Sequence, residues 1–188
     1  MSEVRDRMVA GAARLLAQRG LQSTSFSTVL AATNAPRGSI YHHFPGGKEE
    51  LVAAAIAATE RHALSLLDRQ LGAPAVEVTR SFLSAWQALL IYSDFGAGCA
   101  LVAVTVAAET DAMRQRTAEA FRAWQDKLTQ ALAAGGLSED DARSVATLLL
   151  AASEGAVVIC RAQRDIRPFE LVADQLIEHV RELAGTSS

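Results

Sequence analysis

The sequence predicts an all-α protein with about nine helices in two domains. Apolar residues recur at helical spacing along almost the whole chain, and no segment alternates apolar and polar residues as a half-buried strand would. Glycine and proline residues divide this pattern into segments of helix length. The predicted boundary separates a small N-terminal domain, residues 1–47, from a larger C-terminal domain, residues 48–188.

Three short helices account for the N-terminal domain. The first helix is predicted from apolar residues at helical spacing, namely Val4, Met8, Ala12, Leu15 and Leu16. A second helix begins after a cap at Ser25 or Ser27 and ends at a turn where Asn34 can adopt the left-handed conformation. The third begins at Pro36, because proline has the φ angle of a first helical turn. Two helices joined by so short a turn predict a helix-turn-helix unit.

Residues 36–51, PRGSIYHHFPGGKEEL, carry the chemistry that points to a function. The segment is rich in polar and basic side chains and too short to be folded for its own sake, so it needs a binding partner. The free amides of a helix that begins at Pro36 favour phosphate, and Gly38 lets a nucleic-acid backbone come close. Lys48 opens the next helix, where its ammonium suits a phosphate contact. The segment therefore predicts a DNA-recognition helix.

The candidate DNA-binding residues lie on the second and third helices and at the start of the fourth. They are Ser27, Thr28, Pro36, Arg37, Gly38, Ser39, Tyr41, His42, His43 and Lys48. Ile40 and Phe44 stand four residues apart and are expected to face the core of the domain, whereas His43 fits either surface. A buried aromatic cluster is the alternative interpretation of the motif YHHF, which a helical protein can contain by chance.

Six further helices are predicted beyond residue 47. They cover residues 48–71, 77–92, 98–108, 111–132 and 139–163, and a last helix begins at Pro168. The segment 98–108 is almost continuously apolar and is expected to be buried on all sides. Ser138 with Asp141 gives the N-terminal capping signature of the helix over 139–163.

Residues 4–53 resemble the tetracycline-repressor (TetR) family. The matching segments are AARLLAQRG, FSTVLAATNAPRGSIYHHF and KEELVAA. The chain departs from the family pattern at Asn34, where a glycine is usual, and at Lys48, which follows Phe44 by four residues rather than three. This spacing and the segment GCALVAVTVAAET resemble the branch typified by the LmrA and YxaF repressors. The resemblance implies a ligand-responsive regulator, usually a repressor, that binds a palindromic operator in double-stranded DNA.

The resemblance also implies a homodimer formed through the last two helices. Residues 147–159, TLLLAASEGAVVI, contain small side chains that permit another helix to approach closely, namely Ala151, Ala152, Ser153, Gly155 and Ala156. A twofold dimer presents two recognition helices to an operator with the same symmetry. Packing within one chain is the alternative explanation of these small residues.

A small-molecule inducer is expected in the C-terminal domain, where most aromatic residues of the chain lie. The candidate ligand-binding residues are Phe82, Trp86, Leu89, Tyr92, Cys99, Val102, Val106, Phe121 and Trp124. Ordinary core packing is the alternative for each of them. If they bind a small apolar or aromatic molecule, the mechanism is a population shift, in which the ligand favours the conformation with low DNA affinity.

Charge and cysteine content bear on the remaining classes of function. Residues 1–50 contain six Lys and Arg against four Asp and Glu, a net charge of +2, so with −3 overall the remainder carries −5. This weak basic character is consistent with a DNA-binding face in the N-terminal quarter.

Cys99 and Cys160 lack the spacing of a metal site or a disulfide framework. Buried thiols are the first interpretation of the two cysteines, and a redox sensor is the alternative.

No cofactor or metal is predicted, and the competing classes are an enzyme and a helical binding or interaction protein without DNA activity. The acid–base candidates on helical faces, His62, Glu109, Glu154 and His179, do not pair at a spacing that assembles a catalytic site. The N-terminus has no signal-peptide core, and the longest apolar stretch, residues 97–108, is too short to span a bilayer. We therefore expect a cytoplasmic protein without a membrane segment.

Overall fold

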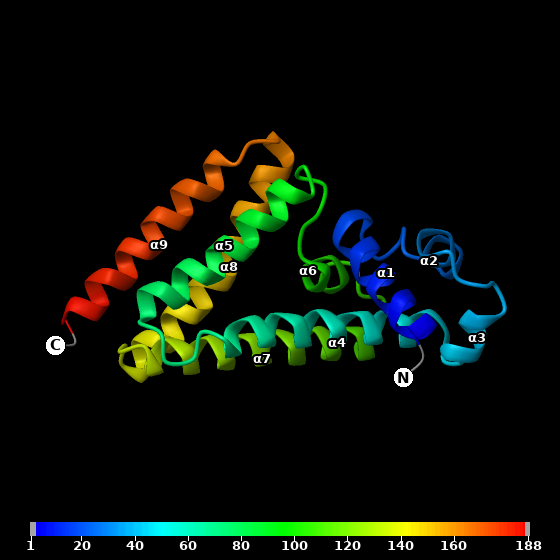
Figure 1. The fold of residues 1–188 in the computed structure, drawn as a ribbon, viewed down its shortest axis with the longest axis horizontal. Coiled ribbons are helices and arrows are strands. Elements are labelled where there is room, and N and C mark those ends of the chain that lie inside the picture. Colours follow the sequence, from blue (N-terminus) through cyan, green and yellow to red (C-terminus); the bar gives the residue numbers. More distant parts are fainter. Residues whose placement is uncertain (1–2, 187–188) are drawn as a thin grey trace. The chain divides into compact units, whose positions relative to one another are not determined.

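The computed structural model describes residues 3–186, which contain nine α-helices and no strand (Figure 1). In chain order the helices are α1 (Glu3–Arg19), α2 (Phe26–Thr33), α3 (Ser39–His43), α4 (Gly47–Asp68), α5 (Ala75–Tyr92), α6 (Ala100–Thr105), α7 (Asp111–Ala134), α8 (Glu139–Gln163) and α9 (Arg167–Thr186). The prediction of an all-α fold with about nine helices is confirmed.

The described helices pack into two compact units. Unit 1 comprises residues 3–62 and 99–121, and unit 2 comprises residues 63–98 and 122–186. Helices α1, α2, α3 and α6 lie wholly in unit 1, whereas α5, α8 and α9 lie wholly in unit 2. The long helices α4 and α7 each contribute residues to both units. The predicted boundary between residues 47 and 48 separates functions rather than packing units, and it stays a prediction.

Helix α1 forms the centre of the unit 1 core and packs on α2 and α6. Its apolar stripe faces inward, so Met8, Ala12, Leu15 and Leu16 are buried. Gly11 allows α1 and α2 to approach closely, because a Cβ atom there would lie 2.3 Å from Thr33 Cγ2. The buried side chains that α2, α3, α4 and their flanking residues add are Val29, Ile40, Phe44, Leu51, Val52, Ala55 and Ile56.

Side-chain chemistry fixes both ends of α2. Ser25 is its N-cap, and Ser25 Oγ accepts a hydrogen bond from the Thr28 amide at 3.2 Å. Thr28 Oγ1 in turn accepts a hydrogen bond from the Ser25 amide at 2.8 Å, which completes a capping box. At the other end Asn34 has φ 49°, in the left-handed region. Of the two serines proposed as the cap, the structure selects Ser25, and Ser27 is exposed.

Helix α8 is the main core helix of unit 2, and α5 and α9 pack against it (Figure 1). Ser138 caps its N-terminus as predicted, accepting a hydrogen bond from the Asp141 amide at 3.1 Å. Its buried residues are Ala142, Val145, Ala146, Leu149, Leu150, Ser153, Ala156, Val157 and Cys160. Within residues 3–186, α8 alone has the length and apolar character to cross a membrane, and 44% of that apolar window is buried. Burial against α5 and α9 explains the apolar character of one face of α8.

The loop between α5 and α6 is held to the C-terminal end of α8. Asp94 and Phe95 both have left-handed backbone angles, with φ 49° and 57°. Arg164 forms an ion pair with the Asp94 carboxylate, and Arg161 donates a hydrogen bond to the Gly96 carbonyl at 3.4 Å. These two contacts hold the loop in a conformation that non-glycine residues rarely adopt.

Several helix ends lie two or three residues from their predicted positions, and the differences at α3 and α6 bear on the prediction of function. Helix α3 begins at Ser39 rather than Pro36, because the Ser39 amide donates to the Pro36 carbonyl at 3.0 Å and closes a turn ahead of the helix. Helix α6 is shorter than predicted, and the expectation that residues 98–108 are buried on all sides is wrong. One face of α6 is buried at Leu101 and Val104, whereas Val106 is 80% exposed.

Candidate DNA interface

Helix α3 buries one face in unit 1 and exposes the other. Ile40 and Phe44 are fully buried, as their four-residue spacing predicted. Tyr41 is 70% exposed, and Arg37 and His42 are exposed as well. Tyr41 and His42 therefore do not belong to a buried aromatic cluster. The side chains that face outward are those able to contact phosphate or base edges.

Phe26, the first residue of α2, positions the exposed ring of Tyr41. The two rings meet edge to face, with centroids 5.4 Å apart and an angle of 79° between their planes. This is a favourable arrangement for an aromatic pair. Phe26 is half-buried, so the contact joins the exposed tyrosine to the core side of the helix-turn-helix unit. Phe26 was not among the predicted site residues.

The serine and histidine side chains of α3 are already engaged within the chain. Ser39 Oγ donates a hydrogen bond to the Pro36 carbonyl at 2.6 Å, so its hydroxyl can accept a further hydrogen bond without rearrangement but cannot donate one. His42 and His43 lie with ring centroids 5.2 Å apart. His43 is half-buried and His42 is exposed, so His42 is the better placed of the two for an external contact.

Lys48 and Thr28 both have structural partners. Lys48 Nζ donates a hydrogen bond to the Leu21 carbonyl at 2.9 Å, which ties the start of α4 to the segment between α1 and α2. An ammonium has three donors, so Lys48 retains capacity for phosphate. The Thr28 hydroxyl takes part in the capping box described above, whereas the exposed Ser27 lies one residue before it.

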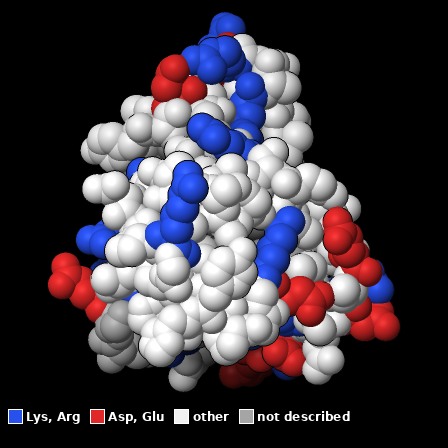
Figure 2. All heavy atoms as spheres, turned by 90° about the vertical axis from the view of Figure 1, so that its right-hand side faces the viewer, with Lys and Arg blue, Asp and Glu red and all other residues white. Residues whose placement is uncertain are grey.

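The surface around these residues is only weakly basic. Figure 2 shows the right-hand side of Figure 1, where Lys and Arg side chains form separate groups, some of them beside Asp and Glu, rather than one continuous patch. This agrees with the net charge of +2 over residues 1–50. Individual basic residues, rather than a broad field, must supply the contacts with phosphate.

Two segments of the chain match family models. Residues 8–55 match the model of bacterial regulatory proteins of the tetR family, and residues 75–175 match the model of the LmrA/YxaF-like transcriptional regulator C-terminal domain. The chain belongs to the TetR family, in its LmrA/YxaF-like branch. This TetR-family protein is thus a DNA-binding transcriptional regulator with a helix-turn-helix domain, as predicted from residues 36–51.

Individual relatives support the assignment over the full length. An HTH-type transcriptional regulator of Mycobacterium tuberculosis is 35% identical over 183 residues, which cover 94% of this chain and 93% of that protein. The regulator YxaF of Bacillus subtilis is 28% identical over 182 residues, covering 95% of each chain. TetR regulators of known structure from Legionella pneumophila and Rhodobacter sphaeroides share the fold at a TM-score of 0.84, with 22% identity over 95% of this chain and 98% and 99% of theirs. The family and these relatives are regulators rather than enzymes.

The candidate ligand-binding residues fall into two groups by the unit to which they belong. Phe82, Trp86 and Leu89 on α5 and Trp124 on α7 belong to unit 2, in which both tryptophans are buried and the Phe82 and Trp86 rings meet at 6.5 Å. Tyr92 also belongs to unit 2 and is 90% exposed. The group in unit 1 comprises Cys99, Val102, Val106 and Phe121. The role of each in ligand binding stays a prediction.

Cys99 and Cys160 are both buried. Burial raises the pKa of the Cys160 thiol, and its sulfur lies 3.7 Å from the Ile166 carbonyl oxygen. A thiol with a raised pKa forms little thiolate at neutral pH and reacts slowly. Among residues 3–186, no three His, Cys, Asp or Glu side chains come together as a metal site would require.

Proposed function

We propose that this regulator represses transcription by binding a palindromic operator and is released by a small apolar or aromatic molecule. The observation that carries the proposal is the outward position of Tyr41 and His42 on α3, whose opposite face is buried, and of Arg37 in the turn before it. Arg37 contributes charge to phosphate, and Tyr41 and His42 supply a ring and a donor at the DNA surface. The supporting contacts are Ser27, Thr28, Pro36, Gly38, Ser39, His43 and Lys48.

A homodimer through α8 and α9 supplies the second recognition helix. The large apolar side chains that these helices expose are Leu148, Val158, Ile159 and Leu171, between 43% and 69% exposed in the single chain. On α8, Ala151 and Gly155 are exposed on the same face as Leu148, so another helix can approach closely. A shallow groove lined by Leu148, Leu171 and His179 lies on this surface. Burial against a second copy accounts for an apolar surface of this extent.

The first experiment tests operator binding. Fluorescence anisotropy is measured on duplex DNA from upstream of the coding sequence and on a scrambled duplex, at two salt concentrations. Arg37→Ala should weaken binding and reduce the salt slope by about two, since each phosphate contact contributes roughly 0.9 and a dimer makes the contact twice. Arg122→Ala, an exposed arginine on α7, is the matched control and should leave the slope unchanged. Equal affinity for both duplexes across a wider genomic selection would refute the proposal.

The second experiment separates induction from DNA binding. Trp86 is 8% exposed and contacts Phe82, so Trp86→Ala should remove a ligand contact without touching the recognition helix. We expect this variant to change the inducer response in an aromatic-compound screen more than the operator affinity. A ligand-to-operator coupling of about 1–3 kcal/mol corresponds to a change in operator affinity of roughly five- to 150-fold. Equal losses of induction and operator binding would contradict a ligand role for Trp86. The same proposal places the protein in the cytoplasm, where its operator lies.

A further inference from the structure

Ser153 on α8 is a buried serine whose hydroxyl has no hydrogen-bond partner. Within residues 3–186 the buried polar side chains are Thr24, Thr79, Thr117 and Ser153. Each of the three threonine hydroxyls donates to the backbone carbonyl four residues before it. Ser153 is 0% exposed, and its hydroxyl makes neither this bond nor another within the described part of the chain. An unsatisfied buried hydroxyl lowers stability, so its presence calls for an explanation.

Ser153 lies in the middle of the buried face of α8. Leu149 and Leu150 are buried one turn before it, and Ala156 and Val157 are buried one turn after it. This face packs on α5 and α9 in the interior of unit 2. Ser153 was predicted to be one of the small residues that permit another helix to approach, and the structure turns it toward its own unit instead.

Helices α5 and α8 lie side by side in unit 2 and run in the same direction. At the start of α5, the Ala75 amide donates a hydrogen bond to the carbonyl of Gly135, shortly before α8 begins, at 3.0 Å. Just beyond the end of α5, Asp94 forms its ion pair with Arg164, the C-cap of α8. These two contacts fix which residues of the two helices lie at the same level.

By this alignment Ser153 lies beside the aromatic residues of α5. Ser153 precedes Arg164 by eleven residues, which is about 16 Å of helix. Eleven residues before Asp94 stands Leu83, and Trp86 follows it by one turn. Both α5 side chains are buried in unit 2. The unsatisfied hydroxyl therefore lies in the region to which the ligand is assigned.

The chemistry of the hydroxyl limits the kind of ligand. A serine hydroxyl has one donor and two acceptor positions. Because the Ser153 hydroxyl does not donate to its own helix, its proton is available to an acceptor atom on a bound molecule. A single hydroxyl cannot compensate the desolvation of a charge, so the matching ligand group is neutral. The edge-to-face rings of Phe82 and Trp86 suit an aromatic body.

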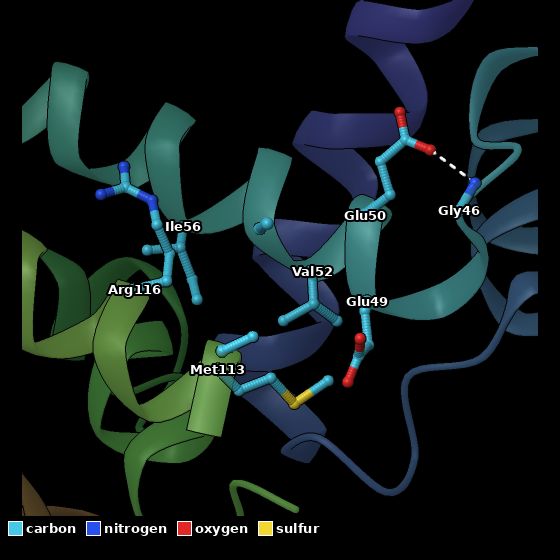
Figure 3. Close-up of a pocket in the computed structure, with 9 residues that line it drawn as sticks. Gly46, Glu49, Glu50, Val52, Ile56, Met113 and Arg116 are labelled. Carbon is cyan, nitrogen blue, oxygen red and sulfur yellow. Dashed lines mark hydrogen bonds between the residues drawn. The ribbon is translucent and has the colours of Figure 1, made fainter. Parts of the chain in front are cut away.

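A slot inside unit 1, between the first turns of α4 and the first turn of α7, holds no group of this kind (Figure 3). The side chains of Glu49 and Glu50 point away from each other, and Glu50 accepts a hydrogen bond from the Gly46 amide at 2.8 Å. Arg116 forms an ion pair with Glu60. Among the described residues, no polar side-chain atom that lines the slot is both buried and without a partner. Ser153 is therefore the better indication of a ligand contact.

We propose that Ser153 anchors the inducer inside unit 2 by donating a hydrogen bond to the carbonyl oxygen of an uncharged aromatic compound. The aromatic body lies against Trp86 and Phe82. This inference rests on the proposed function, which assigns the ligand to these aromatic residues, and it adds the group that orients the ligand. A hydrocarbon of the same shape leaves the hydroxyl unpaired and binds without this contribution.

Ser153→Ala tests the anchor with two compounds of nearly equal shape. Acetophenone carries a carbonyl oxygen, and α-methylstyrene has a methylene group in its place. Ligand-observed NMR on the full-length protein without DNA measures both affinities. Ser153→Ala should weaken acetophenone binding by about two- to tenfold, the contribution of one neutral hydrogen bond, and should leave α-methylstyrene binding unchanged.

The melting temperature of the ligand-free protein supplies a second readout. Ser153→Ala removes an unsatisfied buried hydroxyl and should therefore stabilise the fold. Ser144→Ala is the matched control, because Ser144 is an exposed serine of the same helix whose hydroxyl donates to the Asp140 carbonyl at 2.9 Å. This control accounts for the higher helix propensity of alanine. The melting temperature should rise by about 2–4 °C more in Ser153→Ala than in Ser144→Ala.

Three results would overturn the proposal. They are the absence of acetophenone binding to the unaltered protein, equal changes in the affinity of both compounds in Ser153→Ala, and a rise in melting temperature no larger than that of Ser144→Ala. Trp86→Ala should weaken both compounds alike. If it does so while Ser153→Ala has no selective effect, the anchor is wrong and the ligand site of the proposed function stands. Because no DNA is present, these results are independent of operator binding.

Discussion

Replacing Phe26 with leucine is expected to weaken operator binding, although Phe26 is not one of the exposed residues of the recognition helix. Leucine keeps an apolar side chain at the start of α2 but removes the ring that meets Tyr41 edge to face at 5.4 Å. Tyr41 is 70% exposed, and the Phe26 ring is its aromatic neighbour within unit 1. Without the Phe26 ring, the Tyr41 side chain samples more orientations, and the operator must select the productive one.

The geometry sets an upper limit on the effect. An edge-to-face pair contributes about 0.5–1.5 kcal/mol beyond its buried area. A dimer has two such pairs, so the loss on an operator reaches about 1–3 kcal/mol, or roughly five- to 150-fold in affinity. The salt slope should not change, because no phosphate contact is removed.

A double-mutant cycle separates positioning from a general loss of fold. Operator affinity is measured by anisotropy for Phe26→Leu, Tyr41→Ala and the double variant. If Phe26 acts through Tyr41, its replacement has almost no further effect in the Tyr41→Ala background. Phe82→Leu removes an edge-to-face pair of unit 2, with Trp86, and should leave operator affinity unchanged. Equal losses from Phe26→Leu with and without the Tyr41 ring would refute the reasoning.

Three further predictions concern stability and reactivity. Asn34→Ala should lower the free energy of unfolding in urea by about 1–2 kcal/mol, because the backbone of Asn34 has left-handed angles that alanine disfavours. Asn34→Gly should leave the free energy of unfolding nearly unchanged. Similar losses for both variants would contradict this reasoning. Gly11→Ala should lower the melting temperature because its Cβ meets Thr33 Cγ2, and Thr33→Ser, which removes that methyl, should restore it. Burial raises the pKa of Cys160, so the unfolded chain loses the thiol proton first and the free energy of unfolding should fall as pH rises above the ordinary thiol pKa. Urea unfolding at several pH values, with Cys160→Ala as the control that loses this dependence, checks the sign.

The features that the sequence predicted well are those set by neighbouring residues. Ser25 and Asn34 cap α2 through bonds and backbone angles that involve residues within a few positions. Ile40 and Phe44 lie on the same buried face because they are four residues apart, and this spacing is visible in the sequence. The recognition helix could therefore be located from residues 36–44 alone, although its first residue is Ser39 rather than Pro36.

The features that the sequence did not predict depend on which helix faces which. The Phe26–Tyr41 contact and the slot between α4 and α7 join residues on separate helices, and periodicity reports only that a face is apolar. The left-handed angles of Asp94 and Phe95 are likewise held by Arg161 and Arg164, which lie far along the chain. The burial of α6 was overestimated for the same reason, since a run of apolar residues does not show how many of its sides are covered.

The division of the long helices between the two units has a practical consequence for isolating the DNA-binding part of the chain. Unit 1 is made of two sequence segments, and the second one begins at residue 99. This second segment contributes α6, which packs on α1, and the first turns of α7. A truncation after residue 62 would strip α1 of that cover and expose apolar side chains to water. The DNA-binding unit therefore cannot be isolated by a simple truncation. A soluble minimal fragment would need the two sequence segments of unit 1 joined by an engineered linker.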